Sequence, residues 1–377
     1  MIYFDNAATG YRKPPVVIEA VCRALQGTGN AGRGVNEASL SAARLVFETR
    51  SLLSAMFGGD GPSQTVFTAN ATEALNVAAE GLLHPGDHVV TTVLEHNSVL
   101  RPLYRLQDRG ILLTIVGADA KGRLDMAALE RAVRPDTRAV FCTHASNLTG
   151  NLVDIARIGA MTRKKGLLFV VDAAQTAGLF PIDMSAMGID ALCLTGHKSL
   201  MGPQGTGALL LREGVMAAPL KVGGSGIRTF DREHPAAMPT RLEAGTLNVH
   251  GIAGLGAALR YISSVGQDRI RAREQALAAR FYRGIRAVPG VTVYGDFEAA
   301  ERAPIVSLNL TGVDSGAVSD ALMTSYGIVT RSGGHCAPLM HRALGTEKTG
   351  AVRFSFGYDN TEEEVDTAIR AIRELAE

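Results

Sequence analysis

The sequence predicts an α/β protein with a large domain, built on a mostly parallel seven-stranded sheet between helices, and a smaller α+β domain. Two observations carry this prediction. Short apolar, β-branched runs recur along the chain with helical patterns between them, and such runs are typical of strands that are buried on both faces. From about Gly256 the pattern changes to a long helical stretch and two shorter strands. We assign residues 15–255 to the large domain, and 1–14 with 256–377 to the small domain.

Each element follows from its own stretch of sequence. The runs expected to form the sheet cover residues 65–68, 89–93, 112–116, 139–143, 167–171, 191–194 and 208–211. A stretch rich in Ala, Arg and Leu predicts a long helical stretch from Ala258 to Val288, and strands are expected at 291–294 and 305–310. Thr361-Glu362-Glu363-Glu364 is a capping-box pattern, which predicts the start of a C-terminal helix.

Composition argues against several classes of function. The 377 residues carry 38 Lys and Arg against 37 Asp and Glu, so neither nucleic acid nor an anionic membrane is expected as a partner. No apolar run reaches the roughly 20 residues needed to span a bilayer, and the first residues lack a signal-peptide pattern. The four cysteines are scattered without a Cys-x-x-Cys pair, which fits a reducing cytoplasm and predicts neither disulfides nor a metal site.

Polar residues follow four of the predicted strands. His96, Asn147 and Asp172 come at or just after three strand ends, and His197 with Lys198 comes after a fourth. Ligands of open α/β sheets bind at the carboxyl ends of the strands. Side chains from four separate strands are therefore expected to meet at one edge of the sheet, which is a stronger signal than any single motif.

An acid at the end of one strand and a lysine after the next is the pair that pyridoxal phosphate (PLP) requires. The Lys198 amine can hold the cofactor's aldehyde as a Schiff base, and the Asp172 carboxylate can keep the pyridine nitrogen protonated. The alternative for Lys198 is a surface lysine, but the glycine-rich turn 202–207 that follows favours close approach of a ligand. The alternative for Asp172 is a turn or helix-cap residue.

Three further polar residues have both a structural and a functional interpretation. Thr72 begins an apolar helical pattern, so it is a helix N-cap, a contact of the cofactor phosphate at the positive end of the helix, or both. Gln175 is either a solvated residue or a donor to the phenolic oxygen of PLP, and we favour the second. Arg353 lies in an apolar strand and needs a partner, either a substrate α-carboxylate or an internal salt bridge.

The cysteines differ in their surroundings. Cys22 has apolar neighbours at helical spacing and is expected in the core, and Cys142 and Cys193 lie within strand runs and are expected to be buried and inert. Only Cys336 lies in a glycine-rich segment, next to His335, whose imidazolium would favour the thiolate. The alternative for Cys336 is a cysteine exposed by chance.

With these residues in place, the chain resembles the class V aminotransferase family of fold-type I PLP enzymes and, within it, the cysteine desulfurases. The resemblance runs almost from end to end. Its motifs are Tyr3-Phe4-Asp5-Asn6-Ala7-Ala8-Thr9, Ala71-Thr72-Glu73-Ala74-Leu75-Asn76, Glu95-His96, Ser146-Asn147, Asp172-Ala173-Ala174-Gln175, Thr195-Gly196-His197-Lys198, Glu243-Ala244-Gly245-Thr246, Cys336 and Arg353. This set is specific for the family and less specific for the reaction.

The resemblance implies a PLP site and an obligate homodimer. His96 would stack on the pyridine ring, and Thr246 would reach the cofactor phosphate of the other subunit. The implied cofactor-binding residues are Ala71, Thr72, His96, Asn147, Asp172, Gln175, Thr195, His197, Lys198 and Thr246. The implied catalytic residues are Lys198, Cys336, His96 and Asp172, and the implied substrate-binding residues are Arg353, Asn6 and Arg331.

The activity that the resemblance implies is conversion of L-cysteine to L-alanine. The sulfur would pass to Cys336 as a persulfide and then to an acceptor, for which a protein is one candidate. Two departures from the family pattern bear on the substrate. Gly334 stands where this branch has a second histidine before the cysteine, and Asn30-Ala31-Gly32-Arg33-Gly34 replaces a segment that carries a histidine near the substrate.

Three alternative activities remain open at this point. The nearest is a lyase acting on L-selenocysteine, because the same chemistry removes selenium more easily and the changed loop can favour it. The second is another class V aminotransferase or lyase in which Cys336 has no role. The third is a PLP-binding protein without turnover, for which the set of lysine, acid and arginine would have no use.

Overall fold

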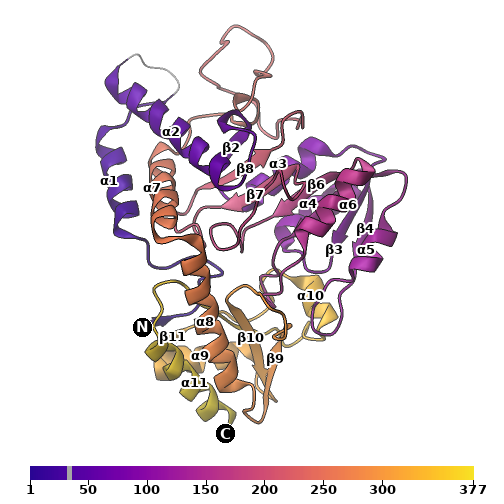
Figure 1. Ribbon diagram of the computed structural model, residues 1–377, viewed down its shortest axis with the longest axis vertical. Helices are drawn as coiled ribbons and strands as arrows, with labels where there is room; N and C mark the ends of the chain where they lie inside the picture. Colours follow the sequence, from indigo (N-terminus) through magenta and orange to yellow (C-terminus); the bar gives the residue numbers. More distant parts are fainter. Residues whose placement is uncertain (32–35) are drawn as a thin grey trace.

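The computed structural model describes residues 1–31 and 36–377, and a seven-stranded sheet forms its centre (Figure 1). In spatial order the strands are β2 (Thr65–Thr68), β8 (Gly207–Leu211), β7 (Ala191–Thr195), β6 (Leu168–Asp172), β5 (Thr137–Thr143), β3 (His88–Thr92) and β4 (Leu112–Val116). β8 runs antiparallel to both its neighbours, and the other neighbouring pairs are parallel. The predicted sheet is confirmed.

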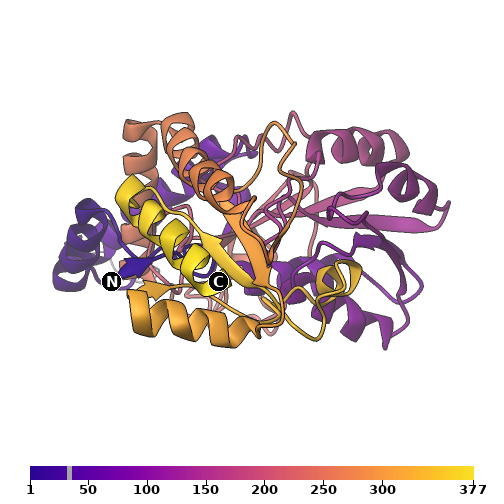
Figure 2. The same ribbon diagram turned by 90° about the horizontal axis from the view of Figure 1, so that it is seen from below.

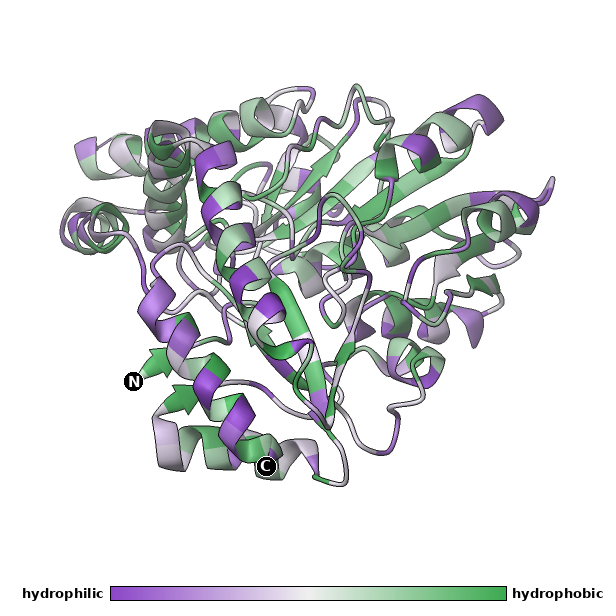
Figure 3. Cartoon of the chain, turned by 60° about the horizontal axis from the view of Figure 1, so that its bottom comes forward, coloured by the Kyte–Doolittle hydropathy of each residue, from purple (hydrophilic) through white to green (hydrophobic). Residues whose placement is uncertain are grey.

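Helices cover both faces of this sheet. They are α2 (Glu37–Met56), α3 (Ala71–Leu82), α4 (Asn97–Gln107), α5 (Met126–Ala132), α6 (Ile155–Lys165) and α7 (Val249–Val265), and α1 (Pro15–Gly27) packs on the outside of α7. Side chains alternate along each strand, so Phe169 joins one apolar core with α2 and α6, and Val170 joins another with α3 and α4. Figure 3 shows the strands as hydrophobic and the outer helices as mixed. Each strand is buried on both faces, as its continuous apolar run predicts.

The remaining helices and strands form the smaller α+β part, drawn in orange and yellow in Figure 2 apart from the indigo β1 at the N-terminus. They are β1 (Ile2–Tyr3), α8 (Gln267–Ile285), β9 (Val291–Tyr294), β10 (Ile305–Leu310), α9 (Ser315–Tyr326), β11 (Ile328–Val329), α10 (Pro338–Ala343), β12 (Val352–Ser355) and α11 (Glu362–Ala376). β10 pairs antiparallel with β12 and β9, and β1 pairs in parallel with β11. The predicted capping box at Thr361 and Glu364 begins α11 and is confirmed.

The helical stretch expected from Ala258 to Val288 is two helices. α7 ends at Val265 and α8 begins at Gln267, because Gly266, with a φ of 93°, turns the chain between them. α7 packs along α1 and α2 and runs across the predicted domain boundary at 255/256, which stays a prediction. Within the ranges that the structure describes, no helix has the length and apolar character needed to cross a membrane.

The expectation that Cys22 lies in the core is wrong. α1 buries Val17 and Ala24, whereas Cys22 is exposed together with Ile18 and Leu25, whose side chains are 56% and 61% exposed. Helical spacing identified an apolar face of α1, but the packing of α1 on α7 decided which face is covered. The two cysteines within strands are buried, as predicted.

Candidate active site

A cavity with an empty volume of about 470 Å³ lies at the carboxyl ends of the central strands. Its lining residues are Asn70, Ala71, Thr72, His96, Ser98, Thr143, Ala145, Asn147, Asp172, Ala174, Gln175, Thr195, His197 and Lys198. The structure thus brings together the strand-end residues that the sequence singled out. It adds Asn70, Ser98 and Thr143, which sequence reasoning missed, although each lies close to a predicted residue or at a strand end.

Lys198 reaches this cavity from the turn between β7 and β8. The Met201 N–H donates to the Lys198 carbonyl at 2.8 Å, which closes the turn. Burial lowers the pKa of the Lys198 amine to about 8, although the nearby Asp172 carboxylate acts in the opposite direction. More of this amine is therefore neutral near pH 7 than in an exposed lysine, as a nucleophilic amine requires.

Asp172 is the last residue of β6 and is buried. Its Oδ1 accepts a hydrogen bond from the Ala174 N–H at 2.9 Å, and the chain continues into a turn. Asp172 therefore has the turn role that was one structural alternative, and it does not cap a helix. Burial raises the pKa of the Asp172 carboxyl, while the Ala174 N–H and the charge of Lys198 favour the ionised form. A buried acid on a cavity wall is a suitable partner for a cationic group of a ligand.

His96 is the N-cap of α4 and lies on another wall of the cavity. Its Nδ1 accepts a hydrogen bond from the Ser98 N–H at 3.0 Å, so the neutral ring carries its proton on Nε2. Burial, followed by the charges of Lys198 and Arg353, lowers the pKa of His96 to about 4. The ring is therefore uncharged near neutral pH and can stack on an aromatic ligand.

The N-terminal end of α3 forms a further wall. The N-cap is Asn70, whose side chain accepts from the Glu73 N–H at 2.9 Å, so the interpretation of Thr72 as the N-cap is wrong. Thr72 lies in the first turn instead, with its Oγ1 2.8 Å from Ser98 Oγ. The free N–H groups and the positive dipole of such a turn attract a phosphate.

Two buried polar atoms on the cavity wall, Asn147 Oδ1 and Thr195 Oγ1, have no partner among the described residues. Buried polar atoms are nearly always paired, so unpaired ones on a cavity wall indicate a polar ligand. The wall also presents the amine of Lys198 for an aldehyde, the carboxyl of Asp172 for a ring nitrogen, and a helix N-terminus for a phosphate. The residues present therefore fit PLP.

The side-chain amides of Asn147 and Gln175 each donate one hydrogen bond to a backbone carbonyl. Asn147 Nδ2 donates to the His335 carbonyl at 2.7 Å, and Gln175 Nε2 donates to the Ala7 carbonyl at 3.1 Å. Each amide has a second N–H, so both can still donate to an oxygen in the cavity.

Arg353 lies on β12, outside the lining of the cavity but in contact with it through Asn147. Nη1 donates to the Asn147 carbonyl and Nη2 pairs with Asp5 Oδ1, both at 2.9 Å. The internal salt bridge is therefore present, but Nε is buried without a partner in the described part of the chain. Arg331 pairs with Arg353 through the backbone, and its side chain is exposed.

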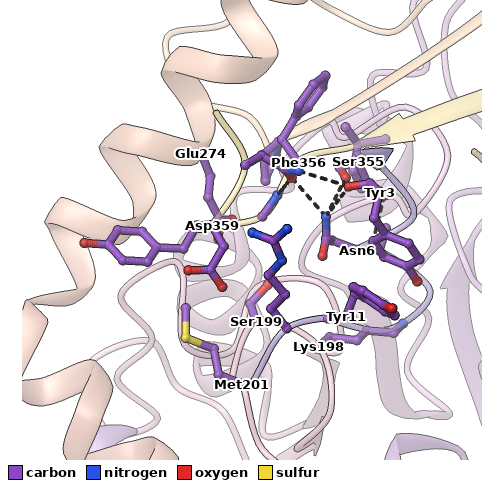
Figure 4. A pocket seen from close by; sticks show the side chains of 18 of the residues that line it. Tyr3, Asn6, Tyr11, Lys198, Ser199, Met201, Glu274, Ser355, Phe356 and Asp359 are labelled. Atoms are coloured by element: carbon purple, nitrogen blue, oxygen red, sulfur yellow. Dashed lines mark hydrogen bonds between the residues drawn. The ribbon is translucent and has the colours of Figure 1, made fainter. Parts of the chain in front are cut away.

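Asn6 lines a different cavity, with an empty volume of about 820 Å³, which shares Lys198 and Gln175 with the first. Figure 4 shows Asn6 and Lys198 on the wall of this second cavity. Asn6 Nδ2 donates to the Ser355 carbonyl at 3.0 Å and to Asn360 Oδ1 at 3.2 Å. The structure does not bring Asn6 into the cavity that holds Asp172 and His96.

Cys336 is exposed in the segment between β11 and α10. Its carbonyl accepts from the Asn97 N–H at 2.8 Å, and the preceding carbonyl, of His335, accepts from Asn147. His335 and Cys336 have φ angles of 49° and 55°, a conformation that residues other than glycine rarely adopt. Burial lowers the pKa of His335 to about 3, so the expectation of an imidazolium beside the thiol is wrong.

Thr246 lies outside the cavity of Lys198. It lines a separate hollow with an empty volume of about 1400 Å³, next to the buried ion pair of Arg50 and Glu243, whose Nη2 and Oε2 are 2.6 Å apart. Ala31 lines the same hollow. Residues 32–34, which belong to the second departure from the family pattern, lie outside the described residues.

Comparisons with known proteins support the family that the motifs indicate. The family model described as Aminotransferase class-V matches residues 2–367. A probable cysteine desulfurase of Methanothermobacter thermautotrophicus is 34% identical over 381 residues, which cover 100% of this chain and 94% of that protein. The cysteine desulfurase IscS of Photobacterium profundum is 33% identical over 395 residues, which cover 100% and 93%.

Solved structures agree as well. An apo cysteine desulfurase from Thermococcus onnurineus has a TM-score of 0.93 at 35% identity, covering 100% of this chain and 94% of that one. The cysteine desulfurase CsdA from Escherichia coli has a TM-score of 0.88 at 27% identity, covering 99% and 94%. The chain therefore belongs to the aminotransferase class-V family.

Proposed function

We propose that the chain is a PLP-dependent cysteine desulfurase that converts L-cysteine to L-alanine and accepts the sulfur on Cys336 as a persulfide. The observation that carries this proposal is the attachment of the exposed Cys336 segment to the wall of the Lys198 cavity, through the hydrogen bond from Asn147 to the His335 carbonyl. The names of the relatives and of the solved structures support the same reaction.

Different residues would hold different parts of the cofactor. Lys198 would bind its aldehyde carbon, Asp172 would face the ring nitrogen, His96 would lie on the ring, and Asn147 and Gln175 would donate to the phenolic oxygen. The phosphate would be held by Ala71, Thr72, Thr195 and His197, together with Thr246 of the partner subunit. When bound, PLP supplies an electron sink for the bonds at the α-carbon of an amino acid.

Three residues would act on the substrate. The Lys198 amine, which the substrate amine would displace from the cofactor, takes the α-proton at Nζ. The guanidinium of Arg353, held by Asp5, orients the carboxylate through Nε. The Cys336 thiolate attacks the substrate sulfur, so that an S–S bond forms and the substrate C–S bond breaks. The electron pair of that bond stays with the β-carbon, which takes up a proton and becomes a methyl group. Lys198 then returns a proton to the α-carbon, which completes alanine.

We also propose a homodimer. Met216, Val222, Ile227 and Phe230 are exposed in the long connection between β8 and α7, and Phe230 is 101% exposed. Part of this connection forms the loop that projects at the top of Figure 1. Apolar side chains gathered in this way mark interaction surfaces. Thr246 lines a hollow together with residues 224–226 of this connection, and we propose that it contacts the cofactor site of a second copy that covers the connection.

The state of the cysteines supports a proposal for the compartment in which the protein acts. All four are free, as is typical of a reducing compartment, and we place the protein in the cytoplasm. The exposure of Cys336 suits transfer of a persulfide to a protein acceptor. The substrate itself is a small amino acid.

The experiment that tests this proposal measures alanine and sulfide release from L-cysteine by PLP-loaded protein, beside Cys336→Ala. We expect release to fall by roughly 10²-fold or more in the variant, while the absorbance of the bound cofactor stays. Release that Cys336→Ala leaves unchanged would favour an activity without this cysteine. A high rate with L-selenocysteine and almost none with L-cysteine would replace the proposal by a selenocysteine lyase.

A further inference from the structure

Residues 9–13, near the N-terminus, contact the backbone carbonyl that precedes the active-site lysine. The His197 carbonyl accepts hydrogen bonds from the Gly10 N–H at 2.9 Å and from Lys13 Nζ at 2.8 Å, and the Thr9 hydroxyl lies 3.4 Å away. The same hydroxyl is 3.0 Å from Nδ1 of His197. One short segment therefore holds the peptide bond that joins His197 to Lys198.

Lys13 supplies the charged group of this contact. It is partly buried, and within residues 1–31 and 36–377 no carboxylate forms an ion pair with it. Its ammonium donates a hydrogen bond to the His197 carbonyl instead. Burial lowers the pKa of Lys13 to about 8. Removing an ammonium from water without a counter-ion costs free energy. Lys13 therefore differs from most surface lysines, which keep the ammonium in water.

The approach of the segment is close. A Cβ added at Gly10 would lie 3.3 Å from the Lys198 carbonyl and 3.4 Å from Lys13 Nζ. On the other side, the Met201 N–H donates to the Lys198 carbonyl at 2.8 Å. The backbone of Lys198 is thus held between its own turn and the N-terminal segment. The contact of Lys13 is the strongest of these that a side-chain substitution can remove, since the others are made by the backbone or are longer.

We propose that Lys13 is a positioning residue for Lys198, because its ammonium holds the His197 carbonyl and so fixes the Cα from which the Lys198 side chain reaches the cavity. This inference rests on the proposed function. A flexible lysine side chain carries its amine to one point only when its Cα is fixed. The charge of Lys13 also lies beside the His197 ring, whose pKa is lowered to about 4 by burial and then by Lys198 and Lys13.

The test compares Lys13→Met, which removes the donor and keeps the apolar stem, with Lys13→Arg, which keeps charge and donors. In PLP-loaded protein we expect PLP to dissociate about tenfold faster from Lys13→Met and within about threefold of wild type from Lys13→Arg. In cofactor-free protein, the rate at which an amine-reactive reagent labels Lys198, followed by mass spectrometry, should change in Lys13→Met and be restored in Lys13→Arg. Lys165→Met, at the exposed end of α6, is the matched control and should change neither rate.

The outcomes separate this inference from the proposed function. Equal dissociation and labelling rates in wild type and both Lys13 variants would overturn it. Rates that change equally in Lys13→Met and Lys13→Arg would overturn it as well. If thermal unfolding shows that Lys13→Met is unfolded, Lys13→Leu, which also removes the donor and keeps an apolar side chain, takes its place in the same comparison. Wild type that carries no PLP on Lys198 after borohydride reduction would instead overturn the proposed function.

Discussion

The Lys198 cavity and the Cys336 segment are built in opposite ways. The cavity walls come from the ends of strands buried on both faces, and the groups on those walls have pKa values shifted by burial. Cys336 is exposed, on a short segment whose backbone takes a conformation that favours glycine. This contrast matches the two tasks of the proposed reaction, since a cofactor needs fixed, water-poor walls and a sulfur carrier needs access to an acceptor.

The largest loss of activity is expected from a substitution in the Lys198 cavity. Lys198→Ala removes both the amine that binds the cofactor and the proposed base, so alanine formation from L-cysteine should fall by roughly 10³-fold or more. The variant should also lose the absorbance of the bound cofactor, which Cys336→Ala should keep. A Lys198→Ala protein that still carried covalently bound PLP would contradict the assignment of the two regions.

Arg353 connects the two regions, so its substitution should have the next largest effect. Arg353→Lys keeps a positive charge near Asp5 but loses the planar set of donors, and the KM for L-cysteine should rise by roughly 10- to 100-fold. Steady-state kinetics measures this. Asp5→Asn is the matched control, because it removes the salt bridge and leaves the guanidinium. A larger loss in Asp5→Asn than in Arg353→Lys would show that the internal salt bridge is the main role of Arg353.

A substitution at Gly334 tests whether the Cys336 segment sets the choice of substrate. It is exposed, and a Cβ added there would meet no atom within 4 Å in the described part of the chain, so Gly334→His should fold normally. If this position sets the substrate, the ratio of kcat/KM for L-cysteine to that for L-selenocysteine should change by about threefold or more. An unchanged ratio would exclude this departure from the family pattern as the source of substrate choice.

The smallest effect is expected on stability, at Glu95, which is buried and contacts the cavity residue Thr143. Glu95 Oε1 accepts from the Thr92 hydroxyl at 2.6 Å and from the Thr143 N–H at 3.1 Å, and burial raises the pKa of Glu95 from 4.5 to about 8. Because the folded chain holds this proton more tightly than the unfolded chain, stability should fall as pH rises from about 4.5 to about 8.

Glu95→Gln removes the titration that causes this fall. The Tm of the variant relative to wild type should therefore rise by a few degrees between about pH 5 and about pH 8. Thermal unfolding at the two pH values checks the sign. The same difference in Tm at both would mean that Glu95 titrates alike in the folded and unfolded chains.

The sequence by itself determined the strands, the C-terminal helix and the strand-end residues that meet in the cavity, although not Asn70, Ser98 and Thr143 beside them. Continuous apolar runs predict strands wherever they occur, and strand ends in a parallel sheet share one edge, so Asp172 and Lys198 were predictable without coordinates. Only the tertiary structure decided which groups are charged and which contacts they make. Cys22 is exposed and His335 is neutral, because both depend on burial by segments distant in the chain. Lys13 faces the His197 carbonyl for the same reason, since a contact across 184 positions leaves no pattern in the local sequence.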